Sequence, residues 1–114
     1  MTSAYLIVLF TQQIEVNQSF YEALGIKFEV GQHGDGPIHL SGKLGDLVFE
    51  LYPCAEADKV THTRIGLMAD DSTQLTDADK KQLNAIADTV HPFDNGQTYL
   101  VMTDPDGRSV EFLY

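Results

Sequence analysis

The sequence has one cysteine, few basic residues and no apolar run of membrane-spanning length, and each shortage excludes something. The single cysteine, Cys54, excludes a disulfide within the chain, which suits a reducing compartment. The apolar run near the N-terminus, residues 4–10, is too short for a membrane span, and no basic residue precedes it as in a secretion signal. We therefore expect a complete, cytoplasmic protein.

Basic side chains are scarce against a large number of acidic ones. Seven Lys and Arg residues face 17 Asp and Glu residues, which gives a formal net charge of −10. This charge repels nucleic acid and anionic membranes at long range, so neither is expected as a partner. A neutral or cationic small molecule is a better candidate for a partner. Solubility alone is the other explanation of the acidic charge. The 114 residues, 43% of them hydrophobic, are enough for one domain with its own core.

Hydrophobic periodicity divides the chain into two similar halves. Apolar runs and helical spacing, punctuated by Gly and Asp, predict the elements of the first half. These are a strand over residues 5–10, a helix over about 13–24 that Gly25 ends, and strands over 27–30, 38–41 and 47–52.

The second half repeats this order. A strand over 63–69 is followed by Thr76-Asp-Ala-Asp79, which resembles a helix capping box. The predicted helix carries Leu83, Ile86, Ala87 and Val90 on one side, and strands follow near 91–93, 98–102 and 109–113. Each half is therefore expected to be a β-α-β-β-β unit.

The last strand of each half contains a glutamate between apolar residues. Glu50 lies in residues 48–52 and Glu111 in residues 110–114, about half a chain apart. An ionised group among apolar neighbours is costly unless something pairs with it. The turn sequence Asp104-Pro-Asp-Gly107 leads directly into the Glu111 strand.

Three segments resemble the vicinal oxygen chelate superfamily, which includes glyoxalases, ring-cleaving dioxygenases and bleomycin-binding (bleomycin resistance) proteins. They are Phe20-Tyr-Glu-Ala-Leu-Gly25, Phe49-Glu-Leu-Tyr52 and Asp104-Pro-Asp-Gly-Arg-Ser-Val-Glu111, and residues 32–39 are similar to bacterial glyoxalase-like proteins. The resemblance implies one α+β domain over residues 1–114. Two βαβββ modules, about 1–58 and 59–114, would pack with their curled mixed sheets around a shared cavity.

The resemblance also identifies the positions at which metal-binding members of the superfamily hold their ion. These positions correspond to Leu6, Glu50, Arg64 and Glu111. An aliphatic side chain donates nothing to a metal, and arginine stays protonated and repels one. We therefore expect neither a metal at these positions nor any other cofactor, with a divalent metal as the alternative.

Arg64 can take the place of the missing cation. Strand alternation puts Arg64, Gly66 and Met68 on one face, which the resemblance turns toward the cavity. We expect a buried ion pair with one or both glutamates, either as part of a ligand site or as a purely structural link. The residues predicted to line the ligand site are Arg64, Glu50, Glu111, His39, Phe10, Tyr52 and Met68.

The histidines supply the remaining candidates for chemistry. His39 lies in a predicted strand and can act as a general base, so the catalytic candidates are His39, Glu50 and Glu111. A relocated metal site using His39 or His62 with the two glutamates is an alternative. His33, His62 and His91 otherwise fit solvated loop positions.

Two classes of function follow from these residues. The first is a glyoxalase- or bleomycin-resistance-like protein that binds a small organic, cationic ligand in a cavity without the usual metal. The alternative is an enzyme: a divalent-metal-dependent lyase, isomerase or dioxygenase of the same superfamily. A homodimer, with or without a working pocket, stays open.

Overall fold

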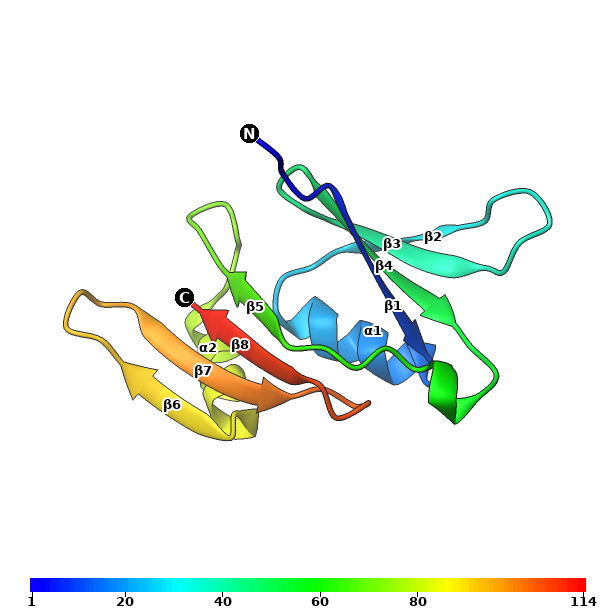
Figure 1. Cartoon of the computed structure of the whole chain (residues 1–114). Coiled ribbons are helices and arrows are strands. Elements are labelled where there is room, and N and C mark those ends of the chain that lie inside the picture. Colours follow the sequence, from blue (N-terminus) through cyan, green and yellow to red (C-terminus); the bar gives the residue numbers. More distant parts are fainter. The chain divides into compact units, whose positions relative to one another are not determined.

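The computed structural model describes residues 1–114 and contains two compact units, each with a four-stranded sheet (Figure 1). The first unit comprises residues 1–22 and 26–61, and the second comprises 23–25 and 62–114. The β-α-β-β-β order predicted from the sequence is present in both halves of the chain. No helix is long and apolar enough to cross a membrane.

The first half of the chain forms a mixed sheet with the strand order β1-β4-β3-β2. Strand β1 runs parallel to β4, and the other neighbouring strands are antiparallel. The elements are β1 (Leu6–Thr11), α1 (Ile14–Ala23), β2 (Phe28–Gly31), β3 (His39–Leu44), β4 (Leu47–Pro53) and the short 3-10 helix η1 (Ala57–Lys59).

One face of this sheet forms the core of the first unit. Leu9, Phe49 and Leu51 are almost fully buried on it. Tyr21 of α1 is also buried, and its ring centroid lies 5.1 Å from that of Phe49. Successive strand residues point to opposite faces, so Glu50 belongs to the face that α1 does not cover.

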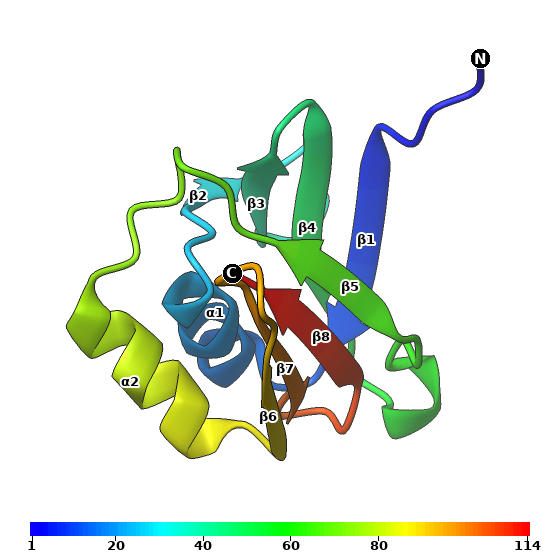
Figure 2. The ribbon, with the colours of Figure 1, turned by 90° about the vertical axis from the view of Figure 1, so that its left-hand side faces the viewer.

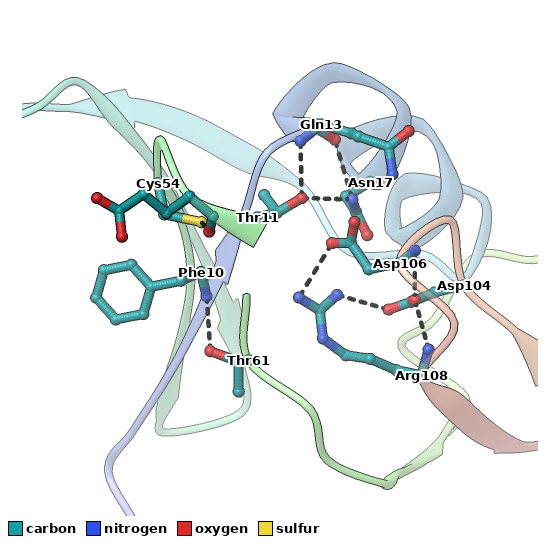
Figure 3. A network of polar contacts seen from close by, with 10 residues as sticks. Phe10, Thr11, Gln13, Asn17, Cys54, Thr61, Asp104, Asp106 and Arg108 are labelled. Atoms are coloured by element: carbon teal, nitrogen blue, oxygen red, sulfur yellow. Dashed lines mark hydrogen bonds and ion pairs between the residues drawn. The ribbon is translucent and has the colours of Figure 1, made fainter. Parts of the chain in front are cut away.

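The Thr11 side chain fixes the start of α1 (Figure 3). Its buried hydroxyl accepts hydrogen bonds from the backbone amide of Gln13 and from the side-chain amide of Asn17, both at 2.9 Å. A hydroxyl in this position satisfies a free amide of the first helical turn. The polar Thr11 and Asn17 are therefore part of the fold and leave no free group for chemistry.

The second half repeats the topology, with the strand order β5-β8-β7-β6. Strands β5 and β8 lie side by side and run in the same direction (Figure 2). The elements are β5 (Ile65–Met68), α2 (Asp77–Ile86), β6 (Thr89–Pro92), β7 (Thr98–Thr103) and β8 (Ser109–Leu113). The core residues of this unit are Ile65, Leu83, Leu100, Met102, Val110 and Phe112.

Helix α2 begins as the sequence predicts and ends earlier. Thr76 and Asp79 form the expected capping box. The prediction that Val90 lies on this helix is wrong, because α2 ends at Ile86 and Val90 belongs to β6. The backbone amide of Asp88 already donates to the carbonyl of Val101 at 2.8 Å, so sheet pairing replaces the helical hydrogen bonds at this point.

The turn before β8 is held by a buried arginine that sequence analysis did not single out. Gly107 has a φ of +88°, and its amide donates to the carbonyl of Asp104 at 2.9 Å, as expected for the turn sequence. The guanidinium of Arg108 lies between two carboxylates, 2.8 Å from Asp104 and 3.1 Å from Asp106 (Figure 3). The Arg108 side chain is fully buried, so this cluster shapes the turn.

Replacing Arg108 by methionine should strongly destabilise the protein. The substitution leaves two carboxylates without their cation, and breaking a buried pair typically costs about 3–5 kcal/mol. Urea unfolding at neutral pH measures the loss. The control is Lys81→Met, which removes one exposed positive charge from α2 of the same unit and should change little. A loss below about 1 kcal/mol for Arg108→Met would mean that the pair is solvated.

Candidate functional site

The strand register places Glu50 at the centre of the face of the first sheet that α1 does not cover. Its register partners are Val8 on β1 and Ser41 on β3. The next row of the same face contains Phe10 and Tyr52, which are also register partners. Strand alternation predicts this arrangement, and the pairing of β4 with both neighbours brings the rows together.

His39 lies against both Glu50 and Tyr52. Its Nε2 atom is 3.3 Å from Oε2 of Glu50 and 3.4 Å from the hydroxyl of Tyr52. The imidazole stacks on the Tyr52 ring with a centroid distance of 4.1 Å and an angle of 8° between the planes. The His39 side chain is only 2% exposed and that of Glu50 12%. The structure thus groups three of the residues predicted for the site.

The second nitrogen of the His39 ring also faces an acceptor. Nδ1 lies 3.3 Å from the carbonyl oxygen of Pro37, which can only accept a hydrogen bond. A neutral imidazole that donates through Nδ1 therefore turns the lone pair of Nε2 toward the Glu50 carboxylate. Partial burial and the negative charge of Glu50 raise the pKa of the Tyr52 phenol, so its hydroxyl stays protonated and can donate to Nε2.

His33 completes the cluster, although the sequence predicted only a solvated loop residue. It is exposed, yet its ring stacks on His39 at a centroid distance of 4.9 Å. One donor atom each from His33, His39 and Glu50 lie within 4.8 Å of one another. The sequence contains a signal for this contact, because the segment between β2 and β3 is rich in Gly and Pro, which favour tight turns. A tight turn brings the chain back close to the strand that it has just left. The alternative site of His39 or His62 with Glu50 and Glu111 joins residues of both units, and it stays a prediction.

In the second unit, Glu111 is paired with the predicted arginine. The register partners of Glu111 are Gly66 and Val101, and the guanidinium of Arg64 contacts its carboxylate. A hydrogen bond from Tyr99, together with the bond and positive charge of Arg64, lowers the pKa of Glu111. A carboxylate satisfied in this way is less available to a ligand than Glu50.

The expectation that the Arg64 ion pair is buried is wrong. The Arg64 side chain is 70% exposed and that of Glu111 27%. Arginine carries its charge on a long flexible stem, which lets the guanidinium reach Glu111 while most of it stays in water. Solvent screens an exposed pair, so removing Arg64 should not cause the large loss of stability expected of a buried pair.

The predicted apolar lining is also more open than expected. Met68 is 69% exposed, and Leu6 and Phe10 are each 41% exposed. Phe10 and Met68, which were predicted to line the ligand site, are therefore largely open to solvent. The prediction that Glu50 and Glu111 share one cavity joins residues of two units, and it stays a prediction.

One cavity in the second unit contains none of the predicted site residues. It has a volume of about 330 Å³ and is lined by Ala23, Asp79, Gln82, Leu83, Ala85 and Ile86. The carboxylate of Asp79 already caps α2 by accepting from the amide of Thr76. The cavity wall therefore offers no free titratable group, and the candidate chemistry lies at Glu50.

The residues at the superfamily's metal positions do not fit a metal ion. Leu6 carries no donor atom, and Arg64 is a cation that contacts the Glu111 carboxylate. A metal at these positions would need two nitrogen or oxygen ligands that the chain does not supply there. The donor atoms that do lie together are those of His33, His39 and Glu50.

The fold is shared with several solved structures. Lactoylglutathione lyase from Agrobacterium tumefaciens is 21% identical with a TM-score of 0.62, over 99% of this chain and 93% of that one. SMU.1112c is 18% identical with a TM-score of 0.66, over 100% and 99%. The oxidase ChaP-H1 is 12% identical with a TM-score of 0.69, over 99% and 95%.

These similarities define the architecture. The chain has a glyoxalase-like fold, as the resemblance of its motifs predicted. No family model matches the chain, and no curated protein matches its sequence. The fold alone assigns no reaction, because one fold hosts many activities.

Replacing Tyr99 by phenylalanine should raise the pKa of Glu111, since the hydrogen bond from Tyr99 is the largest cause of its lowering. A lowered folded-state pKa stabilises the fold above the ordinary carboxyl value, and this stabilisation is lost as the pH falls through the folded value. When the protein is acidified, Tyr99→Phe should therefore unfold at a higher pH than the wild type. Carbon-13 NMR titration of the carboxyl group measures the shift. The control is Tyr5→Phe at an exposed position, and an unchanged Glu111 titration in Tyr99→Phe would contradict the assignment.

Proposed function

We propose that this protein binds a small organic cation on the face of the first sheet that carries Glu50. The observation that carries the proposal is that no lysine or arginine neutralises the Glu50 carboxylate. Its close side-chain polar contact is with His39, whereas Glu111 is satisfied by Arg64 and Tyr99. A largely buried carboxylate without a lysine or arginine partner attracts a positive ligand more strongly than a solvated one does.

Two aromatic rings beside Glu50 support a planar or amphipathic ligand. The ring centroids of Phe10 and Tyr52 lie 5.8 Å apart with an angle of 51° between the planes. Phe10 is 41% exposed, so its ring surface is open to a ligand. A cation over an aromatic ring gains about 0.5–2 kcal/mol, depending on how well water is excluded. Charge and aromatic surface thus favour the same class of ligand.

The functional class agrees with what members of the superfamily do. Bleomycin-binding proteins sequester an organic molecule without transforming it, and this protein would act by the same logic. The overall charge of −10 also favours cations over nucleic acids or anionic membranes as partners.

A second candidate is a lyase, isomerase or dioxygenase. The names of similar structures include a lactoylglutathione lyase and an oxidase. The observation that favours an enzyme is the contact of His39 with both Glu50 and Tyr52, because these three groups can accept, hold and donate a proton. The same face of the first sheet would serve in either case.

Binding should depend on the charge of Glu50. Calorimetric titration with N-methylacridinium should show binding to the wild type, and Glu50→Gln should weaken it about 10-fold, as expected when a carboxylate beside the cation is removed. Acridine, which is largely uncharged at neutral pH, has nearly the same shape and should bind both proteins weakly.

The matched control is Glu22→Gln, which removes one exposed acidic charge from α1 of the same unit. It should leave the affinity for the cation unchanged. Equal weak binding by the wild type and Glu50→Gln would contradict the proposal. Equal losses of affinity in Glu50→Gln and Glu22→Gln would mean that the overall charge of the protein, and not Glu50 itself, attracts the cation.

A further inference from the structure

We propose that His33, His39 and Glu50 form a binding site for a divalent transition-metal ion of the zinc type. The three donor atoms come from β3, β4 and the segment between β2 and β3, and they lie within 4.8 Å of one another. Only Glu50 is shared with the superfamily's metal positions. The site therefore lies within the first unit and needs neither Leu6 nor Arg64.

The ring of His39 is already oriented as in a metal ligand. Its Nδ1 atom lies 3.3 Å from the Pro37 carbonyl, and the tautomer that donates to this carbonyl has its Nε2 lone pair facing Glu50. Histidines that bind metals usually donate their other ring N–H to a carbonyl or carboxylate, which fixes the tautomer. The Nε2 atom of His39 and Oε2 of Glu50 lie 3.3 Å apart, a separation that suits two ligands of one cation.

The spacing of the donors needs little adjustment. In a tetrahedral site with bonds of about 2.1 Å, neighbouring donors are about 3.4 Å apart, close to the observed distance between His39 and Glu50. The His33 donor has to approach by no more than about 1.5 Å. Its segment is exposed and is shaped by a hydrogen bond of 2.9 Å from the amide of Gly36 to the His33 carbonyl. A rotation of the exposed side chain therefore completes the site.

A glycine keeps the approach to His39 open. Gly31 is the register partner of His39, and a Cβ atom at this position would lie 3.0 Å from Nε2. Any larger residue would crowd the atom that binds the ion.

The donor set determines the class of ion. Two imidazoles and one carboxylate suit Zn²⁺, Co²⁺ or Fe²⁺, which accept nitrogen ligands, and do not suit Mg²⁺ or Ca²⁺, which prefer oxygen. Three protein ligands leave at least one coordination position for water or another small ligand. The ion would also occupy the Glu50 carboxylate, so metal and organic cation should compete.

The experiment is a calorimetric titration of chelator-treated, untagged full chain with Zn²⁺. One ion per chain should bind, and His33→Ala and Glu50→Gln should each weaken binding at least 10-fold, because loss of a ligand costs no less than loss of its supporting contacts. The control is His91→Ala, which removes an exposed histidine of the second unit and should bind like the wild type.

His33 is exposed, so His33→Ala should fold normally, and circular dichroism verifies this. The visible spectrum of the Co²⁺ complex provides a second readout, whose bands should be lost in His33→Ala and kept in His91→Ala. Absence of a bound ion in the wild type, or a loss of less than 10-fold in His33→Ala or Glu50→Gln, overturns the proposal.

The two proposals for Glu50 can fail separately. His33→Ala should lose Zn²⁺ and keep N-methylacridinium, whereas Glu50→Gln should lose both. A wild type that binds only the organic cation overturns the metal site alone, and one that binds only Zn²⁺ overturns the proposed function alone.

Discussion

In each unit the last strand lies between the first strand, which runs parallel to it, and the third strand, which runs antiparallel. This pairing puts β4 and β8 inside their sheets, with both edges hydrogen-bonded. Glu50 and Glu111 are thereby held on the faces opposite the cores, while the neighbouring residues Phe49 and Phe112 fill the cores. The rest of each site depends on this constraint, because it decides which side chains can reach the carboxylate.

The two glutamates have different partners. Arg64 and Tyr99, which belong to the same unit as Glu111, contact its carboxylate and lower its pKa. Glu50 instead faces an imidazole whose other nitrogen contacts the Pro37 carbonyl. No lysine or arginine pairs with the Glu50 carboxylate, in contrast to that of Glu111. The repeated fold thus provides one carboxylate that is paired with an arginine and one that is not.

The sequence predicted the architecture well, because its signals were local. Periodicity gave the order of strands and helices, the Thr76 and Asp79 box gave the start of α2, and the positive φ of Gly25 agrees with the predicted end of α1. The alternation of residues in β4 also placed Glu50 and Tyr52 on one face. The end of α2 was missed because pairing of Asp88 with Val101, far along the chain, ends the helix.

The site was harder to predict, since it depends on contacts across strands. The role of His33 depends on the path of the segment between β2 and β3. The burial of Arg108 depends on a turn whose own carboxylates surround the guanidinium.

Proton-detected nitrogen-15 NMR of the histidine rings tests the central claim most directly. The account predicts that His39 carries its proton on Nδ1 and that Nε2 is the nitrogen whose signal moves when Glu50 is replaced by glutamine. A His39 ring with an unprotonated Nδ1, or one that ignores this substitution, would contradict it.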